Sequence, residues 1–539
     1  MSVTVSEQLP LLAAAPNGIG KLRELILELA VRGKLVAQDA GDEPASELLK
    51  RISVEKKRLV VEGKIKQPKE PAVVALKEEL FSLPKGWVWS SLAEAALVNP
   101  RNAAEDALAV SFVPMALIGT NFDGIHGQES RLWGEIKQGF THFAEDDVGV
   151  AKITPCFENS KACVFSGLTN GLGAGTTELH IIRPLPSTID ARYVLAYVKS
   201  PQFLRVGETR MTGTAGQKRL PKNFVETNPF PVPPLAEQHR IVAKVDELMA
   251  LCDRLEAQQA DAESAHAQLV ATLLDSLIRA SDSDDFATSW QRLSAHFHTL
   301  FTTESSIDAL KQAILQLAVT GKLVPQEMAS IKIGDLPAGW RELRIDEFCT
   351  VQGGIQKTPL RHPVSLHFPY LRVANVQRGR IDVSELARYE LSLDELEKWR
   401  LNTGDLLIVE GNGSESEIGR CAIWRGEVLD CVYQNHLMRV RPELEEQVNY
   451  LALYLNSPLG MAHMKRLAIT TSGLFNLSVG KIRSIPVELP PLAEQHRIVA
   501  EVEQLMALCD QLKLRLSQAR ELNEQVATAL VQNAMAKAA

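Results

Sequence analysis

Two long segments of the chain carry apolar residues at alternating steps of four and three positions. The first segment has Ile241, Val245, Leu248, Cys252, Leu255, Leu269 and Leu273, and the second has Ile498, Val502, Leu505, Cys509, Leu512, Leu516, Val526 and Leu530. An average spacing of about 3.5 residues, kept over about four heptads, is typical of a coiled-coil seam. We therefore expect residues 233–280 and 490–539 to form long helices that pair with each other. His266 and Asn523 are expected to place polar groups in that seam.

The regions in front of the two long helices have a different pattern, in which short apolar runs alternate with glycine clusters. The runs lie at 112–118 and 179–185 in the first region, and at 405–410 and 436–441 in the second. Apolar runs of this length beside glycine-rich turns are typical of β-strands. Each region is therefore expected to be a module of mixed helix and strand.

The chain contains two copies of one unit. Of the 24 residues in 233–256, 19 are identical to those in 490–513. Two shorter repeats stand before them, since 22–38 resembles 310–326 and LPKGW at 83–87 resembles LPAGW at 336–340. Near-identical ends around dissimilar middles of similar length indicate one scaffold that presents two different modules.

The repeat also divides the chain into parts. In chain order we expect an N-terminal helix at 1–39, a charged linker or insertion at 40–82, the first module at 83–232, a long helix at 233–280, a linker at 281–307, a second short helix at 308–335, the second module at 336–489 and a long helix at 490–539.

The composition is that of a soluble globular protein, with 45% hydrophobic and 23% charged residues. No apolar run approaches the roughly 18 residues of a membrane span, and Glu7 stands where a signal peptide would carry a basic residue. We expect a cytoplasmic protein without membrane contact. The seven cysteines lack the spacing of a zinc site or a disulfide framework, so no metal is expected.

Motifs of catalysis are missing from the sequence, which has no Walker A pattern, Rossmann fingerprint, GxSxG elbow or HExxH helix. NPFP at 228–231 is only superficially similar to the tetrapeptide of amino-methyltransferases, because it lacks the second consecutive proline. We expect a non-catalytic chain that holds no cofactor itself.

The net charge of −8 does not exclude nucleic acid as a ligand, because phosphate binding depends on a local basic surface and not on the total. Basic residues cluster in both modules, and Asn and Gln side chains suited to base edges stand near them. The candidate DNA-binding residues are Lys152, Asn159, Lys161, Arg210, Gln217, Lys218, Arg219, Gln356, Lys357, Arg372, Asn375, Arg378, Asn412, Gln434, Asn435 and Asn476.

The repeated motifs together carry a family resemblance. Duplicated PPLAEQ helices, the LPxGW motif and the AVxGKLV helix resemble the specificity subunit of type I restriction–modification enzymes. In the first module AKITPCFENSK (151–161) is similar to a stretch of that family's first target-recognition domain, and LRVANVQRGRID (371–382), SEIGRCAIW (416–424) and YQNHLMRVR (433–441) are similar to its second. The resemblance covers nearly the whole chain.

The resemblance implies an α+β fold with two pseudo-twofold-related target-recognition domains separated by a long antiparallel coiled coil. It implies double-stranded DNA as ligand, two methyltransferase subunits as partners, and restriction or motor subunits bound through them. S-adenosylmethionine, ATP and Mg²⁺ would belong to those partner chains. Because the PPLAEQ helices are repeated, we expect them to bind the two methyltransferase copies, through Glu237, Gln238, Arg240, Glu494, Gln495 and Arg497.

A helix over 235–278 would be about 66 Å long, so modules at its two ends would enter major grooves one to two DNA turns apart. Two other classes stay open. A stand-alone sequence-specific DNA-binding protein is disfavoured by the apolar Ile26/Leu29 and Ile314/Leu317 faces, which are expected to need cover from the long helices or from a partner. A protein–protein scaffold without DNA contact is disfavoured by the basic and Asn/Gln clusters.

Overall fold

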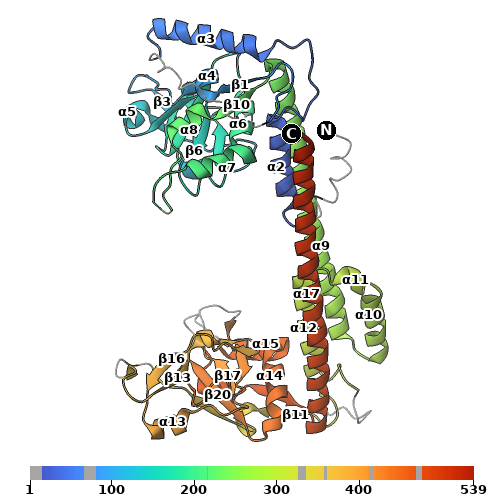
Figure 1. Cartoon of the computed structure of the whole chain (residues 1–539). Helices are drawn as coiled ribbons and strands as arrows, with labels where there is room; N and C mark the ends of the chain where they lie inside the picture. The colour runs from blue at the N-terminus through green and yellow to red at the C-terminus, as the bar shows by residue number, and fades with distance from the viewer. Residues whose placement is uncertain are drawn as a thin grey trace. The chain divides into compact units, whose positions relative to one another are not determined.

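The computed structural model describes residues 12, 15–65, 81–214, 216–325, 336–356, 358, 361–411, 417–468 and 476–538 (Figure 1). The chain forms two compact units, of which the first comprises Met1–Asp261 with Ala519–Ala539 and the second Ala262–Gln518. The first unit contains the first module and the second unit contains the second. Lys357 and Asn412, two of the candidate DNA-binding residues, lie outside the described residues.

The first module is built on two four-stranded sheets and the helices that cover them. One sheet has the order β2 (Ala96–Val98), β9 (Leu179–Pro184), β6 (Val148–Ala151) and β7 (Ala162–Val164), and is antiparallel throughout. The other has the order β4 (Glu129–Leu132), β3 (Ala109–Val113), β8 (Leu172–Gly175) and β5 (Thr141–Ala144), with β3 and β8 parallel. The helices are α4 (Leu92–Ala95), α5 (Trp133–Ile136), α6 (Ala191–Val198), α7 (Pro201–Arg210) and α8 (Lys222–Thr227).

The second module repeats the antiparallel sheet, and three of the four strands of the other sheet, with a different sequence. Its antiparallel sheet has the order β12 (Cys349–Gly353), β20 (Leu437–Pro442), β17 (Leu406–Val409) and β18 (Cys421–Ile423). A three-stranded sheet follows, β16 (Ala387–Glu390), β13 (His367–Leu371) and β19 (Val432–Tyr433), with β13 and β19 parallel. Its main helices are α13 (Leu393–Trp399), α14 (Val448–Asn456), α15 (Pro458–Ala468) and α16 (Val479–Arg483). The mixed helix and strand content expected of both modules is confirmed.

A two-stranded sheet closes each module at its base, where the chain enters and leaves. In the first unit β1 (Val88–Ser91) pairs with β10 (Pro229–Val232), and in the second β11 (Arg341–Arg344) pairs with β21 (Pro486–Leu489). Each entering strand directly follows the LPxGW motif, and each leaving strand directly precedes a long helix. The repeated motifs of the sequence therefore frame the modules physically.

The two long helices are α9 (Leu235–Arg279) and α17 (Leu492–Ala538). In the first unit, Val245 and Cys252 of α9 share a core with Val531 and Met535 near the end of α17. In the second unit, residues 270–277 of α9 share a core with residues 498–509 near the start of α17. Each unit thus combines the beginning of one long helix with the end of the other, which is the pairing of antiparallel helices.

The expected heptad seam does not hold along the whole length of these helices. Leu269 and Val526 are exposed, while Val270 and Ala527 beside them are buried. A straight helix turns every 3.6 residues, so a stripe with a period of 3.5 drifts off the contact face after a few heptads. Asn523 is exposed, and His266 contacts the Thr299 carbonyl oxygen at 3.1 Å, so neither residue sits in the seam as expected.

The short repeated helices are α2 (Gly18–Val31) and α12 (Glu304–Val319), and their apolar faces are covered within the chain. Ile26 and Leu29 lie in the core of the first unit, and Ile314 and Leu317 lie in that of the second. Of the two covers expected, the long helices or a partner, the structure shows packing in cores that include the long helices, so these faces carry no argument against a stand-alone protein.

Both segments expected to be a linker or insertion contain helices among their described residues. In the 40–82 segment, α3 (Ala45–Val61) buries Leu48 and Ile52 completely, and Lys56 Nζ donates hydrogen bonds of 2.6–2.9 Å to three carbonyl oxygens at residues 93, 94 and 96. In the 281–307 segment lie α10 (Ser283–Ala295) and α11 (Phe297–Leu300). Among the described residues there is no helix of the length and apolarity that crossing a membrane requires.

Candidate nucleic-acid interface

Four of the six residues expected to bind a partner protein are buried inside the chain. Glu237 accepts a hydrogen bond of 3.0 Å from the Trp87 indole nitrogen, and Glu494 accepts the equivalent bond of 3.1 Å from Trp340. Gln238 and Gln495 each donate to the carbonyl oxygen of the proline that precedes their helix, at 2.9 and 2.8 Å. These side chains hold the module base to the long helix, so their expected role in partner binding is wrong.

The remaining two residues of that set, Arg240 and Arg497, are half-buried. Arg240 forms an ion pair with Asp42, with a shortest distance of 2.6 Å. Burial raises the pKa of Glu237 above its ordinary value. The residues that this repeated stretch exposes include His239 and His496.

A second internal contact is also present in both modules. The buried carboxylate of Asp147 accepts two hydrogen bonds of 2.7 Å from Arg183, and that of Asp405 accepts two from Arg441 at 2.5 and 2.8 Å. Each aspartate also accepts a backbone N–H at 2.7 Å, from Ala144 and from Asn402. The ion pair with Asp405 raises the pKa of Arg441.

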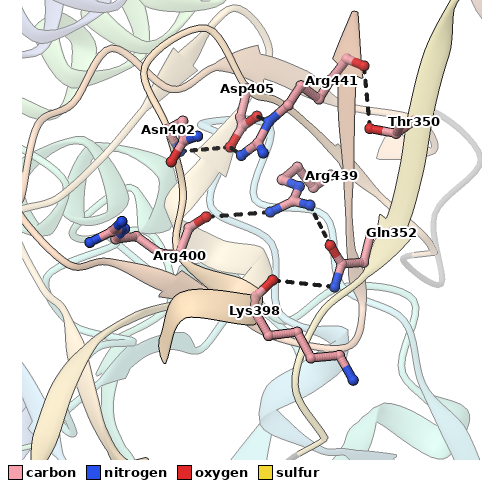
Figure 2. Close-up of polar contacts among 8 residues, drawn as sticks. All are labelled: Thr350, Gln352, Lys398, Arg400, Asn402, Asp405, Arg439 and Arg441. Atoms are coloured by element: carbon pink, nitrogen blue, oxygen red, sulfur yellow. Dashed lines mark hydrogen bonds and ion pairs between the residues drawn. The ribbon is translucent and has the colours of Figure 1, made fainter. Parts of the chain in front are cut away.

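Figure 2 shows the neighbourhood of the second of these pairs. The guanidinium of Arg439 lies between the Gln352 side chain, to which it donates, and the Arg400 carbonyl oxygen at 3.3 Å. Gln352 in turn donates to the Lys398 carbonyl oxygen at 3.4 Å. These polar groups are used inside the module and are not available to a ligand.

The equivalence of the two modules extends to the strand ends where candidate residues gather. In the first module the backbone N–H of Lys152 donates to the Glu178 carbonyl oxygen at 3.0 Å, and the Lys152 carbonyl oxygen accepts from Leu220 at 2.7 Å. In the second, Glu410 N–H donates to the His436 carbonyl oxygen at 2.9 Å, and the Glu410 carbonyl oxygen accepts from Leu477 at 2.6 Å. The same backbone frame therefore places Lys152, Glu178 and Arg219 where the second module has Glu410, His436 and Asn476.

The first strand-end cluster consists of Lys152, Glu178, Gln217, Lys218 and Arg219. Thr154 joins the two segments, because its N–H donates to the Lys218 carbonyl oxygen at 3.0 Å and its hydroxyl accepts from the Lys218 N–H at 3.2 Å. Gln217 and Lys218 are exposed. Arg219 contacts the Glu178 carboxylate at 2.9–3.3 Å, and this contact lowers the pKa of Glu178. Four of the expected residues are thus brought together, and Glu178 is a neighbour that the sequence did not indicate.

The other candidates of the first module are more dispersed. Arg210 is exposed at the end of α7, close to the Thr212–Arg219 backbone pair, and Asn159 is exposed in the loop after β6. Lys161 Nζ donates to the Met115 carbonyl oxygen at 3.0 Å, so its ammonium group is bound within the module.

The second strand-end cluster consists of Gln356, Glu410, Gln434, Asn435, His436 and Asn476. The segments meet because Asn435 N–H donates to the Ile355 carbonyl oxygen at 2.9 Å. The Glu410 carboxylate contacts His436 Nδ1 at 2.8 Å and accepts from the Asn476 amide at 3.4 Å. Gln356 and Asn476 are exposed, whereas Gln434 and Asn435 are half-buried. Glu410 and His436 were not identified from the sequence, although Glu410 ends one of the apolar runs that predicted the strands and His436 begins another.

Three candidates of the second module lie apart from this cluster or are buried. Asn375 is 5% exposed, and its amide bonds the backbone at Arg372, Asp382 and Glu385 over 2.8–2.9 Å. Its expected contact with a base is therefore corrected to a structural role. Arg372 is exposed, 4.0 Å from Glu385, and Arg378 donates to the Asn456 side chain at 3.3 Å.

The exposed side chains of the two strand-end clusters are of the types that recognise nucleic acids. Arginine, lysine, asparagine and glutamine are the side chains that contact phosphates and base edges in protein–DNA complexes. Within the part of the chain that the structure describes, no group of three His, Cys, Asp or Glu side chains is arranged to hold a metal ion.

The chain is also similar to known proteins with a DNA specificity domain. A family model described as the type I restriction modification DNA specificity domain matches residues 337–519. The chain is 41% identical to the EcoEI specificity subunit and 40% identical to the EcoAI specificity subunit, both of type I restriction enzymes of Escherichia coli, over 96% of this chain and 94% of each relative. A chain from a solved structure of a type I R-M system has the same fold, with a TM-score of 0.52 and 20% identity over 84% of this chain and 98% of that one. The chain belongs to the family of type I restriction enzyme specificity subunits.

Proposed function

We propose that each module recognises one half of a bipartite, asymmetric double-stranded DNA site. The observation that carries this proposal is the repeated backbone frame, which presents Lys152, Glu178 and Arg219 in one module and Glu410, His436 and Asn476 in the other. One geometry with two sets of side chains suits a protein that binds two different sequences in a similar way. Neither the stand-alone protein nor the scaffold without DNA accounts for membership of this family.

The chain itself is non-catalytic in this proposal and directs partner subunits to the recognised site. Two methyltransferase subunits bind the chain, one for each repeated half, and restriction subunits join through them. S-adenosylmethionine, ATP and Mg²⁺ are held by those partners, and the complex acts in the cytoplasm. The exposed side chains around His239 and His496 support two equivalent docking surfaces, because repeated surfaces bind repeated partners.

Two measurements test the proposal. Mapping of methylated bases in the host genome is expected to give one consensus with two specific parts separated by an unspecific spacer. A single continuous consensus would contradict recognition of two half-sites by two separate modules. Native mass spectrometry of the purified complex is expected to show two methyltransferase subunits per copy of this chain, and a complex with only one would contradict the docking model.

A further inference from the structure

Arg219 is held on one side of its guanidinium group and open on the other. The Glu178 carboxylate accepts hydrogen bonds from Arg219 Nε at 3.0 Å and from Arg219 Nη2 at 2.9 Å. A guanidinium group has five N–H donors in a planar fork, so three remain at its far end, two on Nη1 and one on Nη2. The Arg219 side chain is 48% exposed and that of Glu178 is 24% exposed, which places the arginine outside the carboxylate.

The backbone around this pair is fixed as well. Arg219 and Thr212 exchange two backbone hydrogen bonds of 2.8 and 3.0 Å, and the next residue, Leu220, donates to the Lys152 carbonyl oxygen. Glu178 N–H donates to the Thr176 hydroxyl at 3.2 Å. An arginine held in this way loses little conformational freedom when it binds a ligand, and this favours both affinity and selectivity.

We propose that Arg219 recognises a guanine in the half-site bound by the first module, with Glu178 as its positioning residue. The inference rests on the proposed DNA recognition by that module. The free end of the fork presents two parallel N–H groups, which match the O6 and N7 acceptors of guanine in the major groove.

A phosphate group fits this position less well than a guanine does. The Glu178 carboxylate neutralises the Arg219 charge and would repel a phosphate oxygen that approached the pair. The uncharged edge of guanine meets no such repulsion. Lys218, which is exposed next to Arg219 and has no carboxylate partner within the described ranges, is suited to the phosphate instead.

The second module supports the role of this position. Asn476 occupies the place of Arg219 in the repeated frame, and Glu410 accepts from its amide nitrogen at 3.4 Å. A glutamate carboxylate therefore contacts the exposed donor at this position in both modules, although Glu410 stands at the place of Lys152 in the frame and His436 stands at that of Glu178. A different donor at the same position suits two modules that recognise different bases.

Selection of binding sites from DNA with a randomised first half-site tests the inference. The chain is purified with its methyltransferase subunits, and variants Arg219→Lys, Arg219→Ala and Glu178→Gln are compared with the wild type. The wild type is expected to select guanine at one position of the first half-site. Both Arg219 variants should reduce that preference about tenfold to a hundredfold, since a bidentate contact discriminates by about that factor. Glu178→Gln should reduce it less and leave affinity nearly unchanged.

Two controls separate a lost contact from a damaged fold. Arg131→Lys changes an arginine that also pairs with a glutamate, Glu129 at 2.8 Å, but lies on β4 away from the strand-end cluster. It should leave the selected sequence unchanged, and every variant should keep the second half-site. If Arg219→Ala weakens binding to all sequences equally and guanine is still selected, the inference is overturned and Arg219 contacts a phosphate. If the wild-type complex selects no two-part sequence, the proposed function itself fails.

Discussion

The indole nitrogen of Trp340 donates a hydrogen bond of 3.1 Å to the Glu494 carboxylate, although 154 residues separate the two in the chain. Trp87 and Glu237 form the same bond at 3.0 Å across 150 residues. In each unit this bond joins the residue before the first strand of a module to the first turn of the helix after its last strand. The repeated motifs therefore close each module at its base, and what lies between them is free to vary.

Loss of the Trp340 donor should destabilise the second unit. Trp340→Phe leaves the buried Glu494 without this hydrogen bond, at a cost of about 1–3 kcal/mol. The denaturant midpoint of the chain should fall accordingly. Trp290→Phe is the matched control, because Trp290 is 49% exposed on α10. A midpoint equally insensitive to both substitutions would mean that the buried bond contributes nothing.

Lys218 should act on DNA affinity without regard to sequence. Lys218→Ala is expected to reduce the slope of log affinity against log salt by about 0.9, because one phosphate contact is lost. Lys57→Ala on the exposed face of α3 serves as a control and should leave the slope unchanged. Binding measured over a series of salt concentrations distinguishes the two, and an unaltered slope for Lys218→Ala would show that this lysine faces solvent in the complex.

Asn375 should affect stability and not sequence preference. Its amide satisfies three backbone groups, so Asn375→Ala is expected to lower the unfolding free energy by about 1–3 kcal/mol. Denaturant unfolding measures the loss, and site selection should return the wild-type consensus for both half-sites. A changed base at one position would contradict the structural role.

The pH dependence of the Glu178–Arg219 pair follows from the direction of its pKa shift. Arg219 lowers the pKa of Glu178, so the carboxylate stays charged and the pair stays formed as the pH falls from neutral to mildly acidic values. Only below the ordinary glutamate range does protonation break the pair and remove its contribution. The guanine preference should therefore be the same at about pH 7.5 and about pH 5.5. A loss of this preference at the lower pH, with binding retained, would show that the pair does not hold Arg219 as described.

The duplication, the mixed modules and the two long helices could be predicted from the sequence, because repeats and apolar periodicity are local properties. The partners of buried polar residues could not. Glu237 and Gln238 lie in a charged, repeated helix and were expected at a protein interface. Both are instead buried and accept hydrogen bonds from residues far away in the chain, Trp87 and Asp190. The Asn375 side chain is of a type that contacts base edges, but in the structure it is buried and hydrogen-bonds the neighbouring backbone. The side-chain types of the first cluster predicted four of its members, Lys152, Gln217, Lys218 and Arg219. Glu178, which orients Arg219, could not be predicted, because only the pairing of β6 with β9 places it beside them.

The central claim is that the two modules share one backbone arrangement and recognise their DNA half-sites independently. An exchange of one module tests this claim most directly. Residues 88–232 are replaced by the equivalent module of a related specificity subunit, from the first strand after Trp87 to the last strand before α9. Methylated sites are then mapped for the hybrid complex. We expect one half of the consensus to become that of the donor and the other half to stay as in the wild type. A hybrid that folds and methylates but has both halves changed, or neither, would contradict the account.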